Sequence, residues 1–167
     1  MVAGSRRDRK QYSTESKVES TEEEPLSCAR WMTSRVLTIK PRESVARARA
    51  MIEEYRINQL PVIKDGLLMG IVTDRDLRDA VNAVTTSAHL AGTSEPVPQT
   101  ADAIPVETVM TEQVMTLASH STIITAAELM RRERIGSVPI VDGQSLVGIV
   151  TRSDILKAFI TLEMLDA

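Results

Sequence analysis

The stretch Gly70–Leu77, with the sequence GIVTDRDL, decides the fold because the chain contains it twice. A second copy, GIVTRSDI, occupies Gly148–Ile155. A shift of 78 positions, from residue 70 to residue 148, brings the two halves of the chain into register without a gap. Such a repeat indicates two copies of one structural unit. The other matched pairs include Met32-Thr33 with Met110-Thr111, Val36 with Val114, Ala48 with Ala126, Ile57 with Ile135, and Pro61 with Pro139.

Around this stretch, each copy contains the same series of local signals. A capping residue precedes apolar residues at helical spacing, and β-rich runs on either side of an Asp-Gly turn indicate a hairpin. The two Asp-Gly turns stand one position out of the repeat register, so we expect the hairpin loops to differ slightly. In chain order, the elements predicted for the two copies are a helix capped by Ser44 or Thr122, a strand at 60–63 or 138–141, a turn at 65–66 or 142–143, a strand at 67–72 or 146–150, and a helix from Thr73 or Thr151.

The predicted elements indicate an α+β (mixed α/β) fold, in which two tandem units, each with a helix, a hairpin and a second helix, pack as a pseudo-two-fold pair. We expect a disordered polar tail over residues 1–27, unit 1 over 28–84, a linker rich in Ser, Thr, Pro and Ala over 85–104, and unit 2 with a C-terminal helix over 105–167. Each unit is small for an independent hydrophobic core. We therefore expect each unit to bury a sheet face against the other, so that the pair folds together.

Composition and charge indicate a soluble globular protein and disfavour several classes of partner. Of the 167 residues, 43% are hydrophobic, which is enough to form a core. Aromatic residues make up 2% and the net charge is −3, so neither base stacking nor attraction to phosphate favours nucleic acid as a partner. Cys28 is the sole cysteine, which excludes an intrachain disulfide and fits a cytoplasmic protein. No apolar run is long enough to cross a membrane.

The ionisable residues do not form a recognisable catalytic constellation. His89 and His120 are isolated in predicted loops, where histidines are usually solvent-exposed. The paired acids, Glu53 with Glu54 and Asp74 with Asp76, fall at predicted helix starts or on exposed faces, where charged side chains are normal. The sequence therefore predicts no enzyme activity, no metal site and no catalytic cofactor.

The pattern Thr-x-x-Asp, at Thr73–Asp76 and again at Thr151–Asp154, has two interpretations. In the first it is a capping box, in which the hydroxyl and the carboxylate satisfy free amides at a helix start. In the second the helix start offers amides and a favourable dipole to phosphate, while the carboxylate accepts the ribose hydroxyls of a nucleotide. Two such helix starts could face one cleft about a pseudo-two-fold axis, but repetition alone does not distinguish the interpretations.

Taken together, the repeated motifs resemble tandem CBS domains over residues 31–160. The resemblance implies two β-α-β-β-α units, each with one further strand before its first helix. By the same resemblance, the units form a disc-like pair, called a Bateman module, that binds AMP, ADP, ATP, S-adenosylmethionine or NAD-type ligands between them. It also implies a regulatory role without catalysis, and frequent homodimerisation. The features that carry it are Met32-Thr33, the helix with Ala48 and Met51, Leu60-Pro61-Val62-Ile63, and Gly70-Ile71-Val72-Thr73-x-x-Asp76-Leu77, all repeated from Met110 to Ile155.

The resemblance further implies roles for individual residues. Asp76 and Asp154 would hold the ribose, and Thr73 and Thr151 would lie near phosphate. Additional contacts, most of them through backbone atoms, would fall at Lys40, Val45, Ile57 and Gln59 in unit 1 and at Ala118, Ile123, Ile135 and Ser137 in unit 2.

One departure from the family pattern concerns phosphate. Members that bind phosphate strongly often have basic residues just before the strand proline, where this chain has Asn58-Gln59 and Gly136-Ser137. A phosphate group would then need cations from elsewhere, so a preference for polyphosphate ligands stays open. The candidate cations are Arg75, Arg152, Arg56 and Arg134.

The predicted C-terminal helix indicates a further contact surface. It is apolar on more than one face, and such a helix is usually covered by another element. We expect a second copy of the chain to cover it in a homodimer. Two functions stay open: a ligand-responsive module that signals to a separate protein partner, and a ligand-free homodimeric scaffold. The apolar residues are Ile155, Leu156, Phe159, Ile160, Leu162 and Met164.

Overall fold

The structure, a computed structural model, describes residues 25–90 and 101–164, with side chains described for residues 25–83 and 101–164. It confirms a mixed α/β fold with the same series of elements in each half of the chain. The elements are α1 (Cys28–Trp31), α2 (Val45–Tyr55), β1 (Gln59–Lys64), β2 (Leu67–Thr73), α3 (Asp74–Leu90), the 3₁₀ helix η1 (Val106–Thr108), α4 (Ile123–Glu133), β3 (Ser137–Asp142), β4 (Ser145–Thr151) and α5 (Arg152–Glu163).

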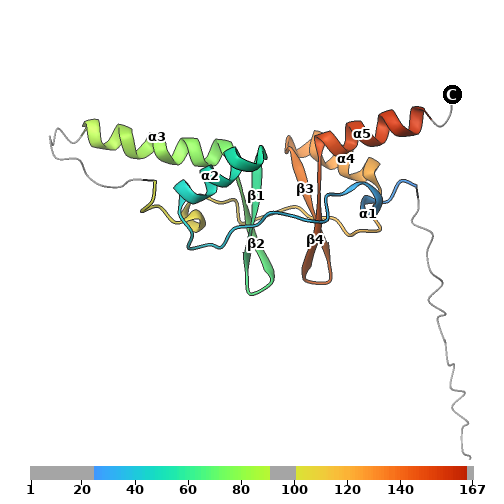
Figure 1. Ribbon diagram of the computed structural model, residues 1–167, viewed down its shortest axis with the longest axis horizontal. Coiled ribbons are helices and arrows are strands. Elements are labelled where there is room, and N and C mark those ends of the chain that lie inside the picture. Colours follow the sequence, from blue (N-terminus) through green and yellow to red (C-terminus); the bar gives the residue numbers. More distant parts are fainter. Residues whose placement is uncertain (1–24, 91–100, 165–167) are drawn as a thin grey trace, which may run out of the picture.

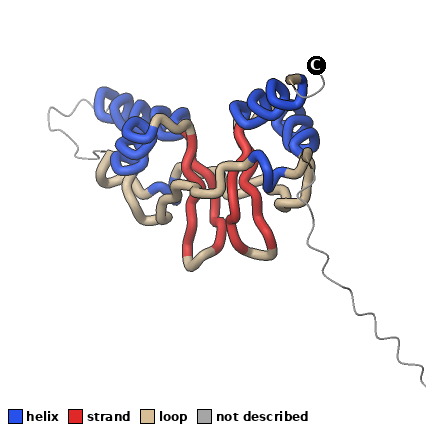
Figure 2. Tube along the Cα trace, turned by 45° about the vertical axis from the view of Figure 1, so that its right-hand side comes forward, coloured by secondary structure: helices blue, strands red, loops and turns tan. Residues whose placement is uncertain are grey.

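Each unit contributes one antiparallel hairpin to a four-stranded sheet of order β1-β2-β4-β3. The hairpins meet where Leu67 pairs with Ser145. The strands lie in the middle of the molecule with helices outside them (Figure 2), and helices α2 to α5 lie along one edge while both hairpin turns lie along the opposite edge (Figure 1). Asp65 and Gly66 both have positive φ in the first loop, whereas in the described loop 143–144 only Gly143 does, so the two loops differ as expected.

The first long helix of each unit has the predicted N-cap. Ser44 Oγ accepts a hydrogen bond from the Arg47 N–H, and Thr122 Oγ1 accepts one from the Thr125 N–H, both at 3.1 Å. Each cap satisfies an amide that has no partner within the helix. The residue after each helix is an arginine in the left-handed conformation, which turns the chain toward the following strand.

The residues that lead into each unit pack in the core of the other unit. Cys28 and Trp31 of α1 are buried among residues of α4, β3, β4 and α5. Val106 of η1 is buried among residues of α2, β1, β2 and α3. Cys28 and Val106 occupy equivalent positions in the repeat, and both are 0% exposed. Each hydrophobic core therefore needs residues from both halves of the sequence.

Extended segments connect these leading residues to their own unit. Thr33 exchanges two backbone hydrogen bonds with Ile149 of β4, at 2.9 and 3.0 Å, and Ile39 then forms a bridge with Val62 of β1. These isolated bridges stand where the β-α-β-β-α prediction has a first strand. The equivalent bridges of the second half join Thr111 to Ile71 and Leu117 to Ile140.

Gly70 and Gly148 permit the close crossing of the leading segments over the hairpins. A Cβ atom on Gly70 would lie 2.7 Å from Met110 Sδ and 2.8 Å from the Thr111 carbonyl oxygen. A Cβ atom on Gly148 would lie 2.7 Å from Met32 Cγ. A glycine inside a strand is expected where another segment approaches this closely, which explains why the repeated motif begins with glycine.

The predicted tail and linker reach beyond the described residues, which exclude 1–24 and 91–100. At the end of the predicted tail, the Pro25 carbonyl accepts a hydrogen bond from Trp31 Nε1 at 2.9 Å. Helix α3 continues to Leu90 and so includes the first part of the predicted linker. At the other end of the linker, Ala101 and Ile104 pack against the core of unit 1.

Candidate functional site

Each Thr-x-x-Asp motif forms a capping box at a helix start. The Thr73 N–H and hydroxyl both donate to Asp76 Oδ2, at 2.9 and 2.6 Å, and the Asp76 N–H donates to Thr73 Oγ1 at 3.3 Å. The Thr151 N–H and hydroxyl likewise donate to Asp154 Oδ2, both at 2.7 Å. The capping interpretation is therefore confirmed. Because each box uses Oδ2, it leaves the second carboxylate oxygen, Oδ1, for another partner.

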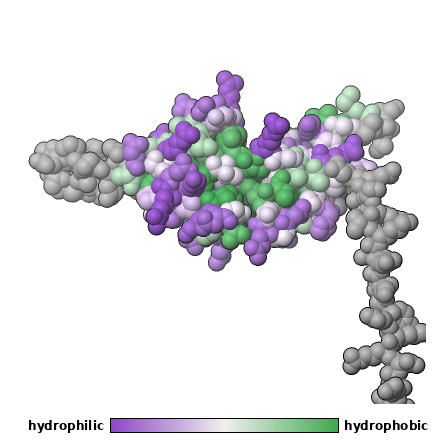
Figure 3. All heavy atoms as spheres, turned by 60° about the horizontal axis from the view of Figure 1, so that its bottom comes forward, coloured by the Kyte–Doolittle hydropathy of each residue, from purple (hydrophilic) through white to green (hydrophobic). Residues whose placement is uncertain are grey.

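The Asp76 carboxylate opens into a cleft between the units, which we call the Asp76 cleft. Its volume is about 390 Å³, within the range of about 300 to 1,000 Å³ that small-molecule sites occupy. Figure 3 shows apolar residues gathered in the middle of the molecule. The cleft is lined by Gln59, Ile71, Thr73 and Asp76 from unit 1 and by Thr111, Gln113, Val114, Met115, Glu133, Arg134, Ile135, Gly136, Ser137 and Pro139 from unit 2.

The crossing of the leading segments forms this cleft. Thr111 and Ile71 exchange two backbone hydrogen bonds, at 2.9 and 3.0 Å, which hold the start of unit 2 beside β2. On the opposite wall, Arg134 ends α4 with a φ of 57°, and this turn brings Ile135 and Ser137 to the cleft. One wall therefore carries the hydroxyl and carboxylate at a helix start, and the other combines apolar side chains such as Ile135 and Met115 with polar and charged ones.

Charged groups of both signs line the cleft. Glu133 is paired with the neighbouring Arg132 at 2.6 Å, so its charge is largely balanced. Arg134 is exposed, and the ion pairs of the described chain do not include it. Arg134 also lines a second, more open hollow of about 470 Å³, which we call the α4–α5 groove. The residues of this groove are Ala127, Met130, Arg131, Arg134, Arg152, Ile155 and Leu156.

Asp154 occupies the equivalent position in unit 2. The bridge between Thr33 and Ile149 holds the start of unit 1 beside β4, as the bridge to Ile71 does for unit 2. Thr151 and Asp154 are half-buried, like their counterparts in unit 1. The structure thus provides two capping carboxylates, each near the leading segment of the other unit, and Asp76 is the one that lines the cleft described above.

The other residues predicted to contact a ligand fall into three groups. Gln59, Ile135 and Ser137 line the Asp76 cleft. Val45 and Ile123 have buried side chains in the two hydrophobic cores. The remainder lie elsewhere: Lys40 in a hollow beside Glu107, Ile57 against the core of unit 1, Ala118 in the turn before α4, Arg75 exposed and paired with Asp79 at 3.8 Å, and Arg152 with its guanidinium donating to the Ile135 carbonyl at 3.2 Å.

The sequence prediction omits much of the wall that unit 2 contributes. Thr111 and residues 113–115 enter the cleft because the start of unit 2 crosses to β2, and local periodicity contains no information on such a crossing. The available signal was the repeated Met-Thr pair at Met110-Thr111, which aligns with Met32-Thr33 and marks the crossing point in both halves.

Other site chemistries find little support in the described part of the chain. Within residues 25–90 and 101–164, no group of three or more His, Cys, Asp or Glu residues is placed to hold a metal ion. The described helices include none that combines the length and apolar character needed to cross a membrane. Burial raises the pKa of the Cys28 thiol to about 11, which disfavours a reactive thiolate.

Comparison with known proteins identifies the repeat. A family model described as the CBS domain matches residues 28–83 and, a second time, residues 106–161. The chain belongs to the CBS domain family. CBS domains generally serve as regulatory modules. The CBS domain-containing protein YhcV of Bacillus subtilis is 30% identical over 124 residues, which cover 74% of this chain and 79% of YhcV.

Two solved CBS domain pairs similar to this chain contain adenosyl ligands. CBSX2 in complex with AMP is 25% identical with a TM-score of 0.67, and the match covers 83% of this chain and 98% of CBSX2. The CBS domain pair of protein MJ0100, in complex with 5′-methylthioadenosine and S-adenosyl-L-methionine, is 26% identical with a TM-score of 0.64, covering 81% and 97%. Similar CBS pairs therefore bind adenosine-containing molecules.

Proposed function

We propose that this CBS domain pair is a non-catalytic regulatory module that binds an adenosyl nucleotide in the Asp76 cleft. The observation that carries the proposal is the position of Asp76, whose Oδ2 serves the capping box while its Oδ1 stays available at the wall of a cleft of about 390 Å³. A carboxylate can accept hydrogen bonds from the two adjacent hydroxyls of a ribose. The related pairs that bind AMP or S-adenosylmethionine support the same class of ligand.

In this proposal each part of the cleft has one role. The ribose binds Asp76 beside Thr73, and the base packs against apolar side chains such as Ile135 and Met115. Arg134 is the cation that a phosphate group meets. It takes the place of the basic residues that this chain lacks just before its strand prolines.

Ligand binding and signalling are coupled because the ligand touches both units. Its greater affinity for one arrangement of the pair shifts the population toward that arrangement. The change is passed to a separate protein partner, and we expect the module to act in the cytoplasm as a homodimer. Asp154 marks a second position at which an equivalent ligand could bind.

A second candidate function, a homodimeric scaffold that works without ligand, is favoured by one observation. Helix α5 and its C-cap Met164 expose four large apolar residues, with exposed fractions of 63% for Leu156, 62% for Phe159, 57% for Ile160 and 76% for Met164. A contiguous apolar face of this kind marks an interaction surface. The scaffold needs this face but not the cleft, so ligand binding separates the two candidates.

Calorimetric titration with AMP, ADP, ATP, NAD and S-adenosylmethionine tests the proposal. Asp76→Asn keeps an oxygen that can accept from Thr73 but removes the charge. We expect it to weaken binding at least about 10-fold, since a hydrogen bond to a charged group contributes about 1.5 to 3 kcal/mol. Thr122→Ala is the matched control, because it removes a helix cap outside the cleft, and it should bind like the wild type.

The possible outcomes separate the interpretations. Folded protein that binds none of the five ligands would exclude this function and favour the scaffold. Loss of binding in Asp154→Asn but not in Asp76→Asn would move the ligand to the other carboxylate. An equal loss in Thr122→Ala would show that helix capping, and not contact with the ribose, causes the effect.

A further inference from the structure

The final helices of the two units differ in a way that the shared fold does not require. Helices α3 and α5 occupy equivalent positions in the repeat and lie along the same edge of the molecule (Figure 1). Leu156 and Ile160 of α5 are 63% and 57% exposed, whereas the equivalent residues of α3 are Arg78 and Asn82. Because unit 1 folds with polar residues at these positions, the apolar residues of α5 are not needed to build unit 2.

The exposed residues of α5 form one continuous surface, which we call the α5 row. Leu156, Ile160 and the C-cap residue Met164, whose backbone is still in the right-handed helical conformation, are spaced four apart on one face, with Phe159 beside them. Leu156 also lines the α4–α5 groove, so the row continues into that groove. Each side chain exposes on the order of 100 Å², so the row offers about 400 Å² per copy.

The area of the row fits a dimer interface better than a free surface. One partner of a standard interface buries about 800 Å². The α5 row supplies about half of this area, and the adjoining groove, with the half-buried Ala127 and Ile155 among its lining residues, extends the apolar surface. The surface of a monomer rarely includes such a patch without a role in binding.

We infer that the α5 row is covered by the α5 row of a second copy, in a head-to-head dimer in which unit 2 faces unit 2. An apolar row is fully desolvated only against another apolar surface, and α3 instead presents Arg75, Arg78 and Asp79 along its exposed side. Contact between one patch and its own copy is the isologous contact of a two-fold dimer. The inference rests on the homodimer of the proposed function and adds its orientation and its residues.

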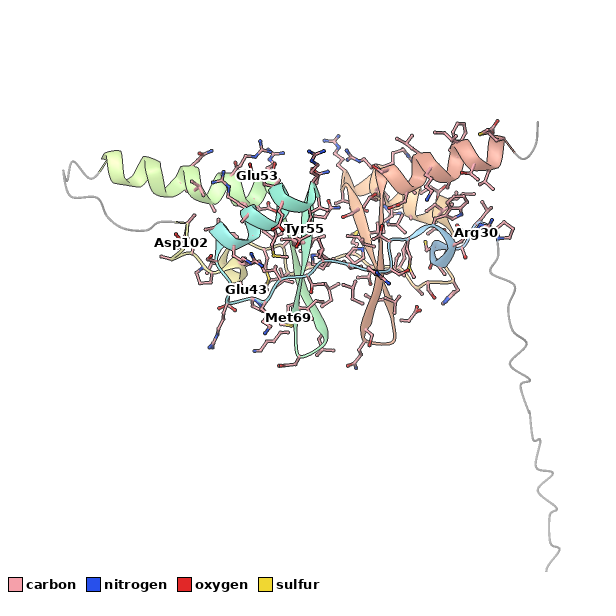
Figure 4. The ribbon with its side chains drawn as sticks, viewed as in Figure 1. Arg30, Glu43, Glu53, Tyr55, Met69 and Asp102 are labelled. Atoms are coloured by element: carbon pink, nitrogen blue, oxygen red, sulfur yellow. The ribbon has the colours of Figure 1, made fainter. Side chains whose placement is uncertain are left out.

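Charged residues favour the opposite, head-to-tail orientation. Glu53, which lies on the helical side of the molecule (Figure 4), and Glu54 stand at the repeat positions of Arg131 and Arg132. A head-to-tail dimer would place these two glutamates opposite Arg131 and Arg132 of the second copy. Exposed ion pairs contribute little in water and are weakened by salt, whereas burial of four large apolar side chains per copy is the larger effect. The α5 row therefore decides the orientation.

The first experiment asks whether the α5 row holds the dimer together. Leu156→Arg combined with Ile160→Asn copies the residues that unit 1 carries at these positions, so the single chain should still fold. We expect sedimentation equilibrium to show a wild-type dimer and a dissociation constant at least about 100-fold higher in the double variant. Ile124→Asn, at a residue 53% exposed on α4 and outside the row, is the matched control and should not change the constant.

The second experiment determines the orientation by cross-linking. Cys28→Val removes the natural thiol by copying the valine at position 106, and Lys157→Cys on α5 or Asp79→Cys on α3 then adds a thiol at equivalent positions. With a short bismaleimide, the head-to-head dimer predicts that the Lys157→Cys chain cross-links to itself. A head-to-tail dimer predicts that cross-links form only when the two variants are mixed.

The results distinguish this inference from the proposals on which it rests. Cross-links between α5 and α3 would overturn the head-to-head orientation but leave the homodimer in place. A monomeric wild type, or a control variant as weakly associated as the double variant, would overturn the role of the row itself. Nucleotide binding, measured separately by calorimetry, decides the ligand proposal independently of both results.

Discussion

The leading segments of the two units differ in sequence, but each one completes the hydrophobic core of the other unit. Cys28 and Val106 are fully buried at equivalent repeat positions, each in the core of the other unit. The segment before unit 1 forms a short α-helix and adds the large side chain of Trp31, whereas the segment before unit 2 forms a 3₁₀ helix and adds Val109. The comparison shows that the fold requires an apolar side chain at this place but tolerates different shapes, provided that the surrounding core adjusts.

The largest effect is expected where the two leading segments differ most. Trp31→Ala should lower the free energy of unfolding by about 3 to 5 kcal/mol, because it removes a large side chain that is only 9% exposed. Val109→Ala, at the equivalent but half-buried position, should lower the free energy of unfolding by a smaller amount. Urea denaturation measures both values. Hydrogen exchange should show the protection lost in α4 and α5, the helices against which Trp31 packs.

The location of the lost protection tests the crossed packing directly. If Trp31→Ala instead opened α2 and β1, which follow it closely in the chain, then α1 would belong to the core of unit 1 and the crossing would be wrong.

An intermediate effect should separate the two glycines of the repeated motif. Gly70→Ala should be the more destabilising substitution, by about 1 to 3 kcal/mol, because its new Cβ would meet the Thr111 carbonyl oxygen, a backbone atom that cannot move without breaking the bridge to Ile71. For Gly148→Ala, the three atoms nearest to the new Cβ all belong to the Met32 side chain, which can rotate away. Thermal and urea unfolding of both variants provide the measurement, and a greater loss in Gly148→Ala would contradict this explanation.

A smaller effect, dependent on pH, should distinguish Cys28 from Val106. Burial raises the pKa of the Cys28 thiol from 9.0 to about 11. Between these values the unfolded chain loses the proton while the folded chain keeps it, so unfolding becomes more favourable as the pH rises. The protonated Cys28 thiol makes its full contribution to the free energy of unfolding below about pH 9. This contribution is lost as the pH rises toward about 11, by at most about 1.4 kcal/mol per pH unit.

The matched variant for this prediction is Cys28→Val, which copies the residue of the second unit. Urea denaturation at about pH 8 and about pH 10 should show a smaller decrease in stability for the variant than for the wild type. Equal decreases would mean that Cys28 ionises as readily in the folded chain as in the unfolded chain.

Local chemistry was enough to predict most elements of each unit. Ser44 and Thr122 cap the predicted helices, both predicted hairpins form, and both Thr-x-x-Asp motifs form the predicted boxes. The second hairpin turn lies one position later than predicted, at 143–144, because Asp142 still pairs with Ser145 at the end of β3. The crossing was not predicted, because hydrophobic periodicity says which residues are buried but not which unit buries them. The apolar pair Cys28 and Val106, in register ahead of each unit, was compatible with packing in either core.

The candidate site shows the same limit. Thr73, Asp76, Gln59, Ile135 and Ser137 were predicted and lie together in the Asp76 cleft. Thr111 and residues 113–115 were missed because they reach the cleft through the crossing. Arg134 was predicted as a candidate cation, but its position in the cleft depends on a left-handed backbone conformation that is uncommon for residues other than glycine and that the sequence did not predict.

The crossed packing has a consequence for how the chain is made. Synthesis proceeds from the N-terminus, so α2, β1, β2 and α3 leave the ribosome before Val106, and the first core lacks part of its apolar cover until then. Helix α1 is made earliest, yet its partners in α4, β3, β4 and α5 are made last. The protein therefore cannot finish one unit and then add the other, and both cores close only late in translation.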